Sequence, residues 1–320
     1  MKIGVFDPVF GAIPLEAMLD RIQALGLEAV ELGAGNYPGN RHCDPVALLS
    51  NEQMRRAFQH AFTSRGLLIS ALSCHGNPLH PDAARAARDD AVYRAAVRLA
   101  ASLGVDCVNL FSGCPGDGPN AIRPNWVTCA WPSDYLETLR WQWDDVVLPY
   151  WEEATAFARE YGVRLGFEMH PGFVVYNPRT LLRLRDAVGE AVGANLDPSH
   201  LFWQQIDPIV AIGELGPAIH HVHAKDTAID PWNTSRNGVL DIVTDGDAGE
   251  RSWAFRSVGD GHGLSFWKRF VEALQLAGYD GVLSIEHEDR LASVEVGLDR
   301  AIATLRGALV GGPAERTSRQ

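Results

Sequence analysis

The chain has 320 residues, of which 46% are hydrophobic, and a formal net charge of -12 at pH 7. This length and apolar content allow one large core and suit a single α/β barrel. The acidic balance argues against a nucleic-acid-binding protein, because such proteins usually present a basic surface.

Targeting and redox signals favour the cytoplasm. The first residues, MKIGVFDPVF, have neither the apolar centre nor the cleavage site of a signal peptide. The sequence contains no run of about 18 apolar residues, so we expect no transmembrane helix and no membrane partner. The five cysteines are odd in number and include no Cys-x-x-Cys pair, which indicates reduced thiols.

Short runs rich in Val, Ile, Leu and Phe recur along the chain and predict buried parallel strands. They are KIGVF (2–6), AVELG (29–33), LLISALS (67–73), VDCVNLF (105–111), VRLGFEM (163–169), VGANLD (192–197), HHVHA (220–224) and GVLSIEH (281–287).

Helical patterns separate these runs. The predicted helices cover 14–25, 82–103, 134–161, 178–188, 265–276 and 293–307. A Gly precedes several of the strands, as in LGLEAVEL and LGVDCV, which is typical of a helix C-terminus.

Eight β-then-α units in about 300 residues predict a single (β/α)8 TIM barrel over residues 1–310. A doubly wound sheet is the competing architecture, but it usually needs fewer strands, and no Gly-x-Gly-x-x-Gly motif follows the first strand. We expect residues 311–320 to form a disordered tail.

Two long loops interrupt the regular pattern. Residues 112–133 follow the fourth strand and residues 227–262 follow the seventh, and both are rich in Trp and in Pro or Gly. TIM barrels build their active sites at the C-terminal ends of the strands. We therefore expect these loops to form ordered lids over a pocket.

Each of the last four predicted strands ends in carboxylates or imidazoles. The segments are GFEMHP (166–171), NLDPSH (195–200), HVHAKD (221–226) and SIEHED (284–289). On one barrel face the three acids among them would repel each other without a cation. We therefore predict one divalent metal ion, held by Glu168, Asp197, His223 and Glu286.

The ligand types narrow the choice of metal. Three carboxylates and one imidazole suit Mn²⁺, Mg²⁺, Co²⁺ or Fe²⁺ better than a structural zinc site, which favours Cys and His. A lone acid at a strand end is more often a helix cap or an ion-pair partner. Four such groups on neighbouring strands favour the metal.

Strand alternation separates the three histidines of the seventh strand. His221 and His223 share one face, and His220 lies on the other. His223, at the tip, is the candidate ligand. We expect His221 to support the site or to belong to the core, and His220 to pack on the helix side.

The segments FEMHP, NLDPSH, HVHAKD and SIEHED, in this order, resemble the xylose isomerase-like TIM-barrel superfamily, the sugar phosphate isomerase/epimerase family. The resemblance covers essentially the whole chain and is specific to the superfamily, but not to one substrate. It implies that Glu168, Asp197, His223 and Glu286 bind one divalent ion, commonly Mn²⁺. It further implies that His200 and Arg256 contact the substrate.

The resemblance also implies a mechanism for an isomerase or epimerase of a ketose or keto-sugar. The metal would hold a carbonyl oxygen and the neighbouring hydroxyl, and a cis-enediolate would form between Glu168 and Glu286 by proton removal. Return of the proton to the opposite face gives an epimer, and return to the neighbouring carbon gives an isomer. Loss of a β leaving group would make the enzyme a lyase.

Three further residues are candidates by position. His75 ends the third strand and is a candidate for substrate binding, with a structural role as the alternative. Lys225 either contacts the substrate or pairs with Asp226. His170 follows Glu168 closely and is a candidate for an additional catalytic base.

The two long loops suggest a larger substrate, such as a 3-keto-glycoside. A metal-dependent lyase or deglycosidase that cleaves it by β-elimination is therefore the alternative function. An apurinic endonuclease of the same fold is disfavoured because it needs more metal ions and a basic groove. A non-catalytic sugar-binding protein is disfavoured by Glu168 and Glu286. As further partners we leave open a second copy of the chain or a small accessory subunit.

Overall fold

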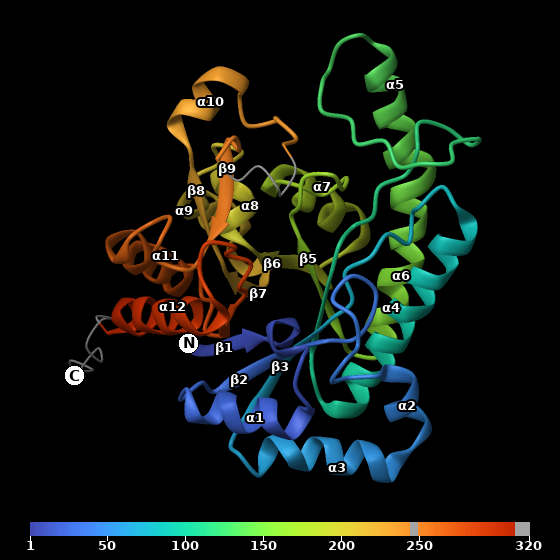
Figure 1. Ribbon diagram of the computed structural model, residues 1–320. Coiled ribbons are helices and arrows are strands. Elements are labelled where there is room, and N and C mark those ends of the chain that lie inside the picture. The colour runs from blue at the N-terminus through green and yellow to red at the C-terminus, as the bar shows by residue number, and fades with distance from the viewer. Residues whose placement is uncertain (244–248, 311–320) are drawn as a thin grey trace, which may run out of the picture.

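The structure is a computed structural model that describes residues 1–243 and 249–310. Within these ranges, eight parallel strands form a closed barrel surrounded by helices (Figure 1). The strands are β1 (Lys2–Phe6), β2 (Ala29–Gly33), β3 (Leu68–Ser73), β4 (Cys107–Leu110), β5 (Arg164–Glu168), β6 (Val192–Leu196), β7 (Ile219–Ala224) and β10 (Val282–Ile285). The predicted disordered tail, 311–320, lies outside the described residues.

Each barrel strand pairs with its neighbours in chain order, and β10 closes the barrel against β1 in parallel register from Lys2↔Val282 to Val5↔Ile285. Every residue of β6 and β7 is buried, as expected for strands covered on both faces. The predicted TIM barrel is confirmed, and all eight strands lie where the apolar runs placed them.

The helices lie outside the barrel, with α1 and α3 below it and α4 and α6 on its right in Figure 1. The helices are α1 (Leu15–Ala24), α2 (Pro45–Ser50), α3 (Glu52–Thr63), α4 (Ala83–Leu103), α5 (Asp134–Trp141), α6 (Leu148–Glu160), α7 (Pro178–Val188), α8 (Pro198–Phe202), α9 (Pro208–Leu215), α10 (Pro231–Asn237), α11 (Leu264–Leu276) and α12 (Val294–Leu309). A π-helical segment, 142–147, joins α5 to α6.

Sequence signals explain how these helices begin and end. Asp82 caps α4 by accepting hydrogen bonds from two backbone N–H groups of its first turn, and Gly104 ends it with a φ of 72°, which favours glycine. No predicted helix corresponds to α2, α3, α8, α9 or α10. For α3 a signal was present, because Asn51 caps the helix and Phe58 and Phe62, four residues apart, are buried.

The two long loops differ in structure. Residues 112–130 contain no helix or strand, and Gln142 anchors them through hydrogen bonds from its side-chain amide to the carbonyls of Gly116 and Asn125. The second loop contains α10 and an antiparallel hairpin of β8 (Asp226–Ile229) and β9 (Trp253–Arg256). Both α5, which follows the first loop, and α10 lie at the top of Figure 1.

Two composition-based expectations concern the whole chain. Among the described helices we find none with the length and hydrophobicity needed to span a bilayer. All five cysteines are free, in agreement with the expected reduced thiols.

Candidate metal centre and active-site cavity

The four predicted metal ligands converge at one end of the barrel. Glu168 is the last residue of β5, Asp197 follows β6, His223 lies near the end of β7, and Glu286 follows β10. One ligand atom of each side chain lies within 4.8 Å of those of the others, so the group could hold a metal ion. They meet because β5, β6, β7 and β10 are consecutive in the barrel.

Asp197 provides the clearest test of whether these residues fit a cation. Its Oδ1 accepts a hydrogen bond from the backbone N–H of Ser199 at 2.8 Å and so caps α8. Its Oδ2 is buried and forms no hydrogen bond, although His200 Nε2 lies 3.3 Å away. Burial raises the pKa of Asp197 to about 6. Because an unpaired buried carboxylate oxygen is unfavourable, a divalent ion would supply the missing partner, and the residues fit one.

Glu168 lies among three imidazoles. Nε2 of His75 is 2.9 Å and Nδ1 of His223 is 3.3 Å from its Oε2, and Nε2 of His200 is 3.0 Å from its Oε1. Burial alone would raise the pKa of Glu168, but these imidazoles outweigh it and hold the pKa well below its usual range. Glu168 is therefore ionised at neutral pH.

Lys225 lies on the other side of the centre. Its Nζ contacts Glu288, lies 3.3 Å from Oε2 of Glu286 and 3.8 Å from Oδ2 of Asp197, and stands over the ring of Phe255. Burial would lower the pKa of Lys225, but the carboxylates raise it well above its usual value. The lysine is therefore a buried ammonium group among the acids.

The alternative pairing of Lys225 with Asp226 is not the one that the structure shows. The carboxylate of Asp226 instead accepts hydrogen bonds from the backbone N–H groups of Gly259, Gly261 and His262. The side chains of Lys225 and Asp226 separate because neighbouring residues of an extended chain point to opposite faces.

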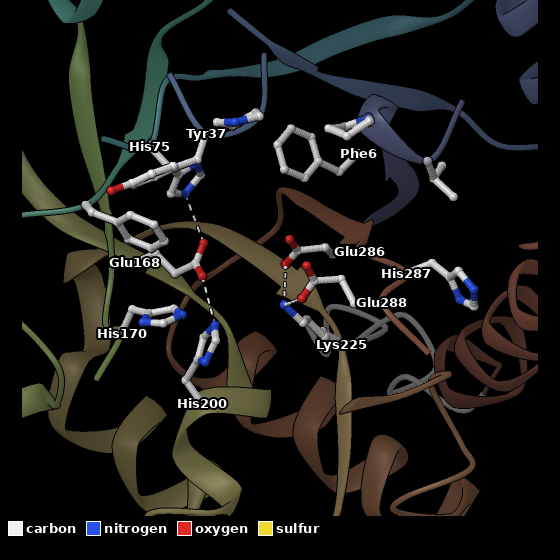
Figure 2. Close-up of a pocket in the computed structure, with 14 residues that line it drawn as sticks. Phe6, Tyr37, His75, Glu168, His170, His200, Lys225, Glu286, His287 and Glu288 are labelled. Carbon is white, nitrogen blue, oxygen red and sulfur yellow. Dashed lines mark hydrogen bonds and ion pairs between the residues drawn. The ribbon is translucent and has the colours of Figure 1, made fainter. Parts of the chain in front are cut away.

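A cavity of about 420 Å³ opens beside the centre. Figure 2 shows Glu168 with His75, His170 and His200 on one side of it, and Lys225, Glu286 and Glu288 on the other. Aromatic and apolar side chains complete the wall, among them Phe6, Tyr37 and Phe111. Such a mixture suits a polyhydroxylated ligand, which presents both hydroxyls and C–H faces.

His170 contributes a neutral imidazole to this cavity. Its Nδ1 lies 2.6 Å from the carbonyl oxygen of Pro171, to which it donates a hydrogen bond, so Nε2 carries the lone pair. Burial lowers the pKa of His170 to about 3, and the neighbouring His200 contributes in the same direction. The ring is therefore uncharged at neutral pH and only weakly basic.

Arg256 does not reach this cavity in the structure. Its Nε donates a hydrogen bond to Oδ2 of Asp289 at 3.2 Å, and its Nη2 lies 3.6 Å from Asp260. It is not among the described residues that line the cavity. Of the predicted substrate contacts, the structure brings His75, His200 and Lys225 to the cavity.

The other two histidines of β7, His220 and His221, are both buried and have different polar partners. His220 directs Nδ1 to the carbonyl oxygen of Leu165, and His221 lies between Asn109 and Asn195 inside the barrel. Both therefore have polar partners that account for their burial without a ligand.

The sequence places Glu31 at the end of the second strand, where the pocket should lie, but its charge inside the apolar run AVELG was not assigned a specific role. Its carboxylate is fully buried and receives hydrogen bonds from the hydroxyls of Ser73 and Ser284 and from the amide of Asn109. Nε2 of His223 lies 2.9 Å from Oε1. The cavity contacts of Tyr37 and Phe111 were also missed, because no pattern marks such contacts in a sequence.

The fold and the site define the class of protein. The sequence model of the xylose isomerase-like TIM barrel family matches residues 19–307, and the chain belongs to that family. Over 310 residues it is 38% identical to the uncharacterized protein YfiH of Bacillus subtilis. The alignment covers 96% of this chain and 98% of YfiH. It is 28% identical to inosose dehydratase of Lacticaseibacillus casei over 132 residues, 41% of this chain and 42% of the relative.

Solved structures share the fold at low sequence identity. A D-tagatose 3-epimerase-like protein aligns with a TM-score of 0.63 at 20% identity, over 97% of each chain. The probable 3-DHS dehydratase AsbF of Bacillus anthracis aligns with a TM-score of 0.66 at 14% identity, over 98% of this chain and all of that one. A xylose isomerase-like TIM barrel protein of Mycobacterium smegmatis in complex with magnesium aligns with a TM-score of 0.63 at 18% identity, over 97% of each chain.

Proposed function

We propose that the protein is a divalent-metal-dependent sugar isomerase or epimerase that moves a proton next to the carbonyl of a ketose or keto-sugar. One observation carries this proposal: the buried carboxylate of Glu168 and the half-buried carboxylate of Glu286 flank one cavity and belong to the same four-residue group that could hold a metal ion. Relatives named as epimerases and dehydratases are compatible with it.

The proposed metal is Mn²⁺, and Mg²⁺, Co²⁺ and Fe²⁺ have compatible ligand chemistry. A bound ion of this kind acts as a Lewis acid on substrate oxygens and makes the neighbouring C–H more acidic. The four ligand side chains, Glu168, Asp197, His223 and Glu286, would hold it.

The side chains around the cavity would carry out the proton transfers. Glu286 is ionised and borders the cavity, so it can remove a proton from one face of a substrate carbon. Glu168, on the other side, is held in place by His75 and His200. Because it is also ionised, it must first take a proton from solvent before it can return one to the opposite face. Proton return to the opposite face inverts the carbon, whereas return to the adjacent carbon isomerises the sugar.

Elimination from a 3-keto-glycoside or a related keto-polyol is the second candidate, and Lys225 favours it. In elimination, a base removes the proton next to the carbonyl, its electron pair forms a C=C bond, and the C–O bond to the β leaving group breaks. The ammonium group of Lys225 on the cavity wall can hydrogen-bond to the leaving oxygen and stabilise its developing charge, and solvent can supply the proton that this oxygen needs. Glu286, which is ionised and lines the cavity, would serve as the base, and the neutral imidazole of His170 would hydrogen-bond to the substrate.

The test is NMR of candidate ketoses, keto-sugars and 3-keto-glycosides incubated in D2O with the Mn²⁺-loaded protein. We expect deuterium at the carbon next to the carbonyl, together with an epimer or an isomer. An unsaturated keto product with release of the leaving group would instead establish elimination. Absence of exchange with every substrate, or full activity after removal of all metal, would refute the proposed metal-dependent proton transfer.

A further inference from the structure

We propose that Glu31 is a positioning residue for the metal ligand His223: it keeps the ring hydrogen on Nε2 and turns the lone pair of Nδ1 toward the other three ligands. This inference rests on the proposed metal centre, but it concerns residues of this chain whose arrangement can be measured without substrate.

The two ring nitrogens of His223 face different groups. Nε2 lies 2.9 and 3.0 Å from the two carboxylate oxygens of Glu31. Nδ1 lies 3.0 Å from Oε2 of Glu286 and 3.3 Å from Oε2 of Glu168. An ionised carboxylate can only accept hydrogen bonds, so Nε2 must donate to Glu31. Without an ion, Nδ1 can likewise donate to Glu168 and Glu286. With an ion among these carboxylates, Nδ1 is the nitrogen that would bind it, because Nε2 stays with Glu31.

Other neighbours of the ring do not compete with this arrangement. The amide nitrogen of Asn195 lies 3.2 Å from Nε2, but it donates a hydrogen bond to Oε2 of Glu168 at 3.3 Å, so it does not require a lone pair on Nε2. The ring of Phe6 stacks on the imidazole of His223, with centroids 5.5 Å apart and planes inclined by 28°. The carboxylate thus selects the tautomer, while the packing of Phe6 restrains the plane of the ring.

Glu31 is itself held rigidly. It comes from β2 and meets His223 of β7 in the barrel interior, 192 residues along the chain. Ser284 donates its hydroxyl to Oε2 at 2.6 Å, Asn109 donates its amide to Oε1 at 2.9 Å, and Ser73 also donates to Oε1. These donors hold the carboxylate of Glu31 in one position. The carboxylate in turn fixes the orientation of the imidazole of His223.

A second metal ion is the competing interpretation, because ligand atoms of Glu31, His221 and His223 also lie within 4.8 Å of one another. Hydrogen-bond partners argue against it. Both oxygens of Glu31 already receive hydrogens from neutral donors, and Nδ1 of His221 lies 3.1 Å from both Asn109 and Asn195. We therefore expect one ion, bound at Nδ1 of His223, and none at Glu31.

The experiment compares the wild-type protein with Glu31→Gln in two measurements. Titration with Mn²⁺, with free ion read by EPR in the absence of substrate, should show one site and a Kd that rises about 10–100-fold in the variant. NMR of the metal-free, ¹⁵N-histidine-labelled proteins is recorded at a pH high enough to leave the ring of His223 neutral, because the surrounding carboxylates raise its pKa. It should place the hydrogen of His223 on Nε2 in the wild type. In the variant it should be shared with Nδ1, because the glutamine amide can also donate to Nε2.

Two further variants separate positioning from general damage. Asp89→Asn removes another buried carboxylate, which accepts a hydrogen bond from the backbone N–H of Asn77, and should change neither the Kd nor the tautomer. Glu31→Asp keeps the charge but shortens the side chain. It should also weaken Mn²⁺ binding, and it replaces Glu31→Gln if that variant does not fold.

Three results would overturn the inference: an unchanged Kd with an unchanged tautomer, an Nδ1–H tautomer in the wild type, or two bound ions of which one is lost with Glu31. If the wild type binds no divalent ion, the proposed function fails, but the NMR measurement still decides whether Glu31 sets the tautomer of His223.

Discussion

The two carboxylates beside the cavity differ in their surroundings. The side chain of Glu168 is 4% exposed and touches three imidazoles, whereas that of Glu286 is 17% exposed and touches Lys225 and His223. Burial would raise the pKa of Glu286, but Lys225 and His223 lower it to about 2. The more accessible carboxylate is therefore also an ionised one, as a base for substrate C–H groups requires.

Replacing Glu286 by Gln removes this base with little change in shape. We expect deuterium uptake from D2O into the substrate to fall by about 10²–10⁴-fold, the usual contribution of a positioned base. The rate is measured by NMR at saturating Mn²⁺, so that weaker metal binding does not limit it. Glu153→Gln, at an exposed ion pair with Arg94 on the outer helices, is the control. Undiminished exchange in Glu286→Gln would exclude Glu286 as the base.

Arg256 forms an ion pair with Asp289 and does not line the cavity in this structure. The side chain of Asp289 is fully buried and accepts hydrogen bonds from the backbone N–H and hydroxyl of Ser257 as well as from Arg256. Its loss leaves a buried N–H group without a partner, which costs about 1–3 kcal/mol.

We therefore expect Asp289→Ala to lower the free energy of unfolding by about 1–3 kcal/mol, and Arg256→Ala to lower it by less, because the arginine is partly exposed and solvent weakens its ion pairs. Chemical denaturation measures both. A large rise in KM in Arg256→Ala without loss of stability would instead assign Arg256 to the substrate, as the family resemblance implies.

At the scale of elements, one carboxylate ties the start of the β8–β9 hairpin to the segment that follows the hairpin. Asp226, the first residue of β8, accepts hydrogen bonds from the backbone N–H groups of Gly259, Gly261 and His262 and contacts the ring of His262. A Cβ on Gly261 would lie 2.4 Å from the carbonyl oxygen of Thr227. The close approach of these two backbones thus requires glycine.

Gly261→Ala should push the segment away from Asp226 and destabilise the protein by about 1–3 kcal/mol, the usual effect of overpacking. Limited proteolysis should then cut residues 226–263 faster than in the wild type. Gly263→Ala is a matched control two residues away, because a Cβ there meets nothing within 4 Å and its φ is -69°. Equal proteolysis of both variants would mean that this attachment does not hold the hairpin.

At the scale of the whole molecule, the candidate metal centre joins four consecutive strands and would couple metal binding to folding. An ion that binds only the folded chain stabilises it by mass action. Asp197 offers a clean variant, because Asn can still cap α8 while it removes the charge.

We expect Mn²⁺ to raise the free energy of unfolding by about 2.7 kcal/mol at a free concentration of about 100 times its Kd. A chelator should reverse the effect, and both are read as shifts in Tm. Asp197→Asn should lose most of the Mn²⁺-dependent shift. A shift of the same size in this variant would place the ion elsewhere.

The sequence by itself determined the barrel and the four candidate ligands. Apolar runs that follow a helix-ending glycine are local signals of barrel strands. The parallel strands of a barrel must all end at one face. Acids or imidazoles at the ends of four consecutive strands are therefore expected to lie close to one another. The short α2, α8, α9 and α10 were missed because each is about two turns long or less and is set by packing more than by pattern.

Only the tertiary structure decided which distant residues meet around these ligands. The contacts of Glu31 with His223, of Asp289 with Arg256 and of Lys225 with Glu286 join residues far apart in the sequence. Such contacts depend on the register with which β10 closes against β1 and on where the hairpin settles, and neither leaves a local pattern. The histidine-rich strand β7 illustrates the difference: alternation separated His221 from His223, but the partner of each ring nitrogen came from the closed barrel.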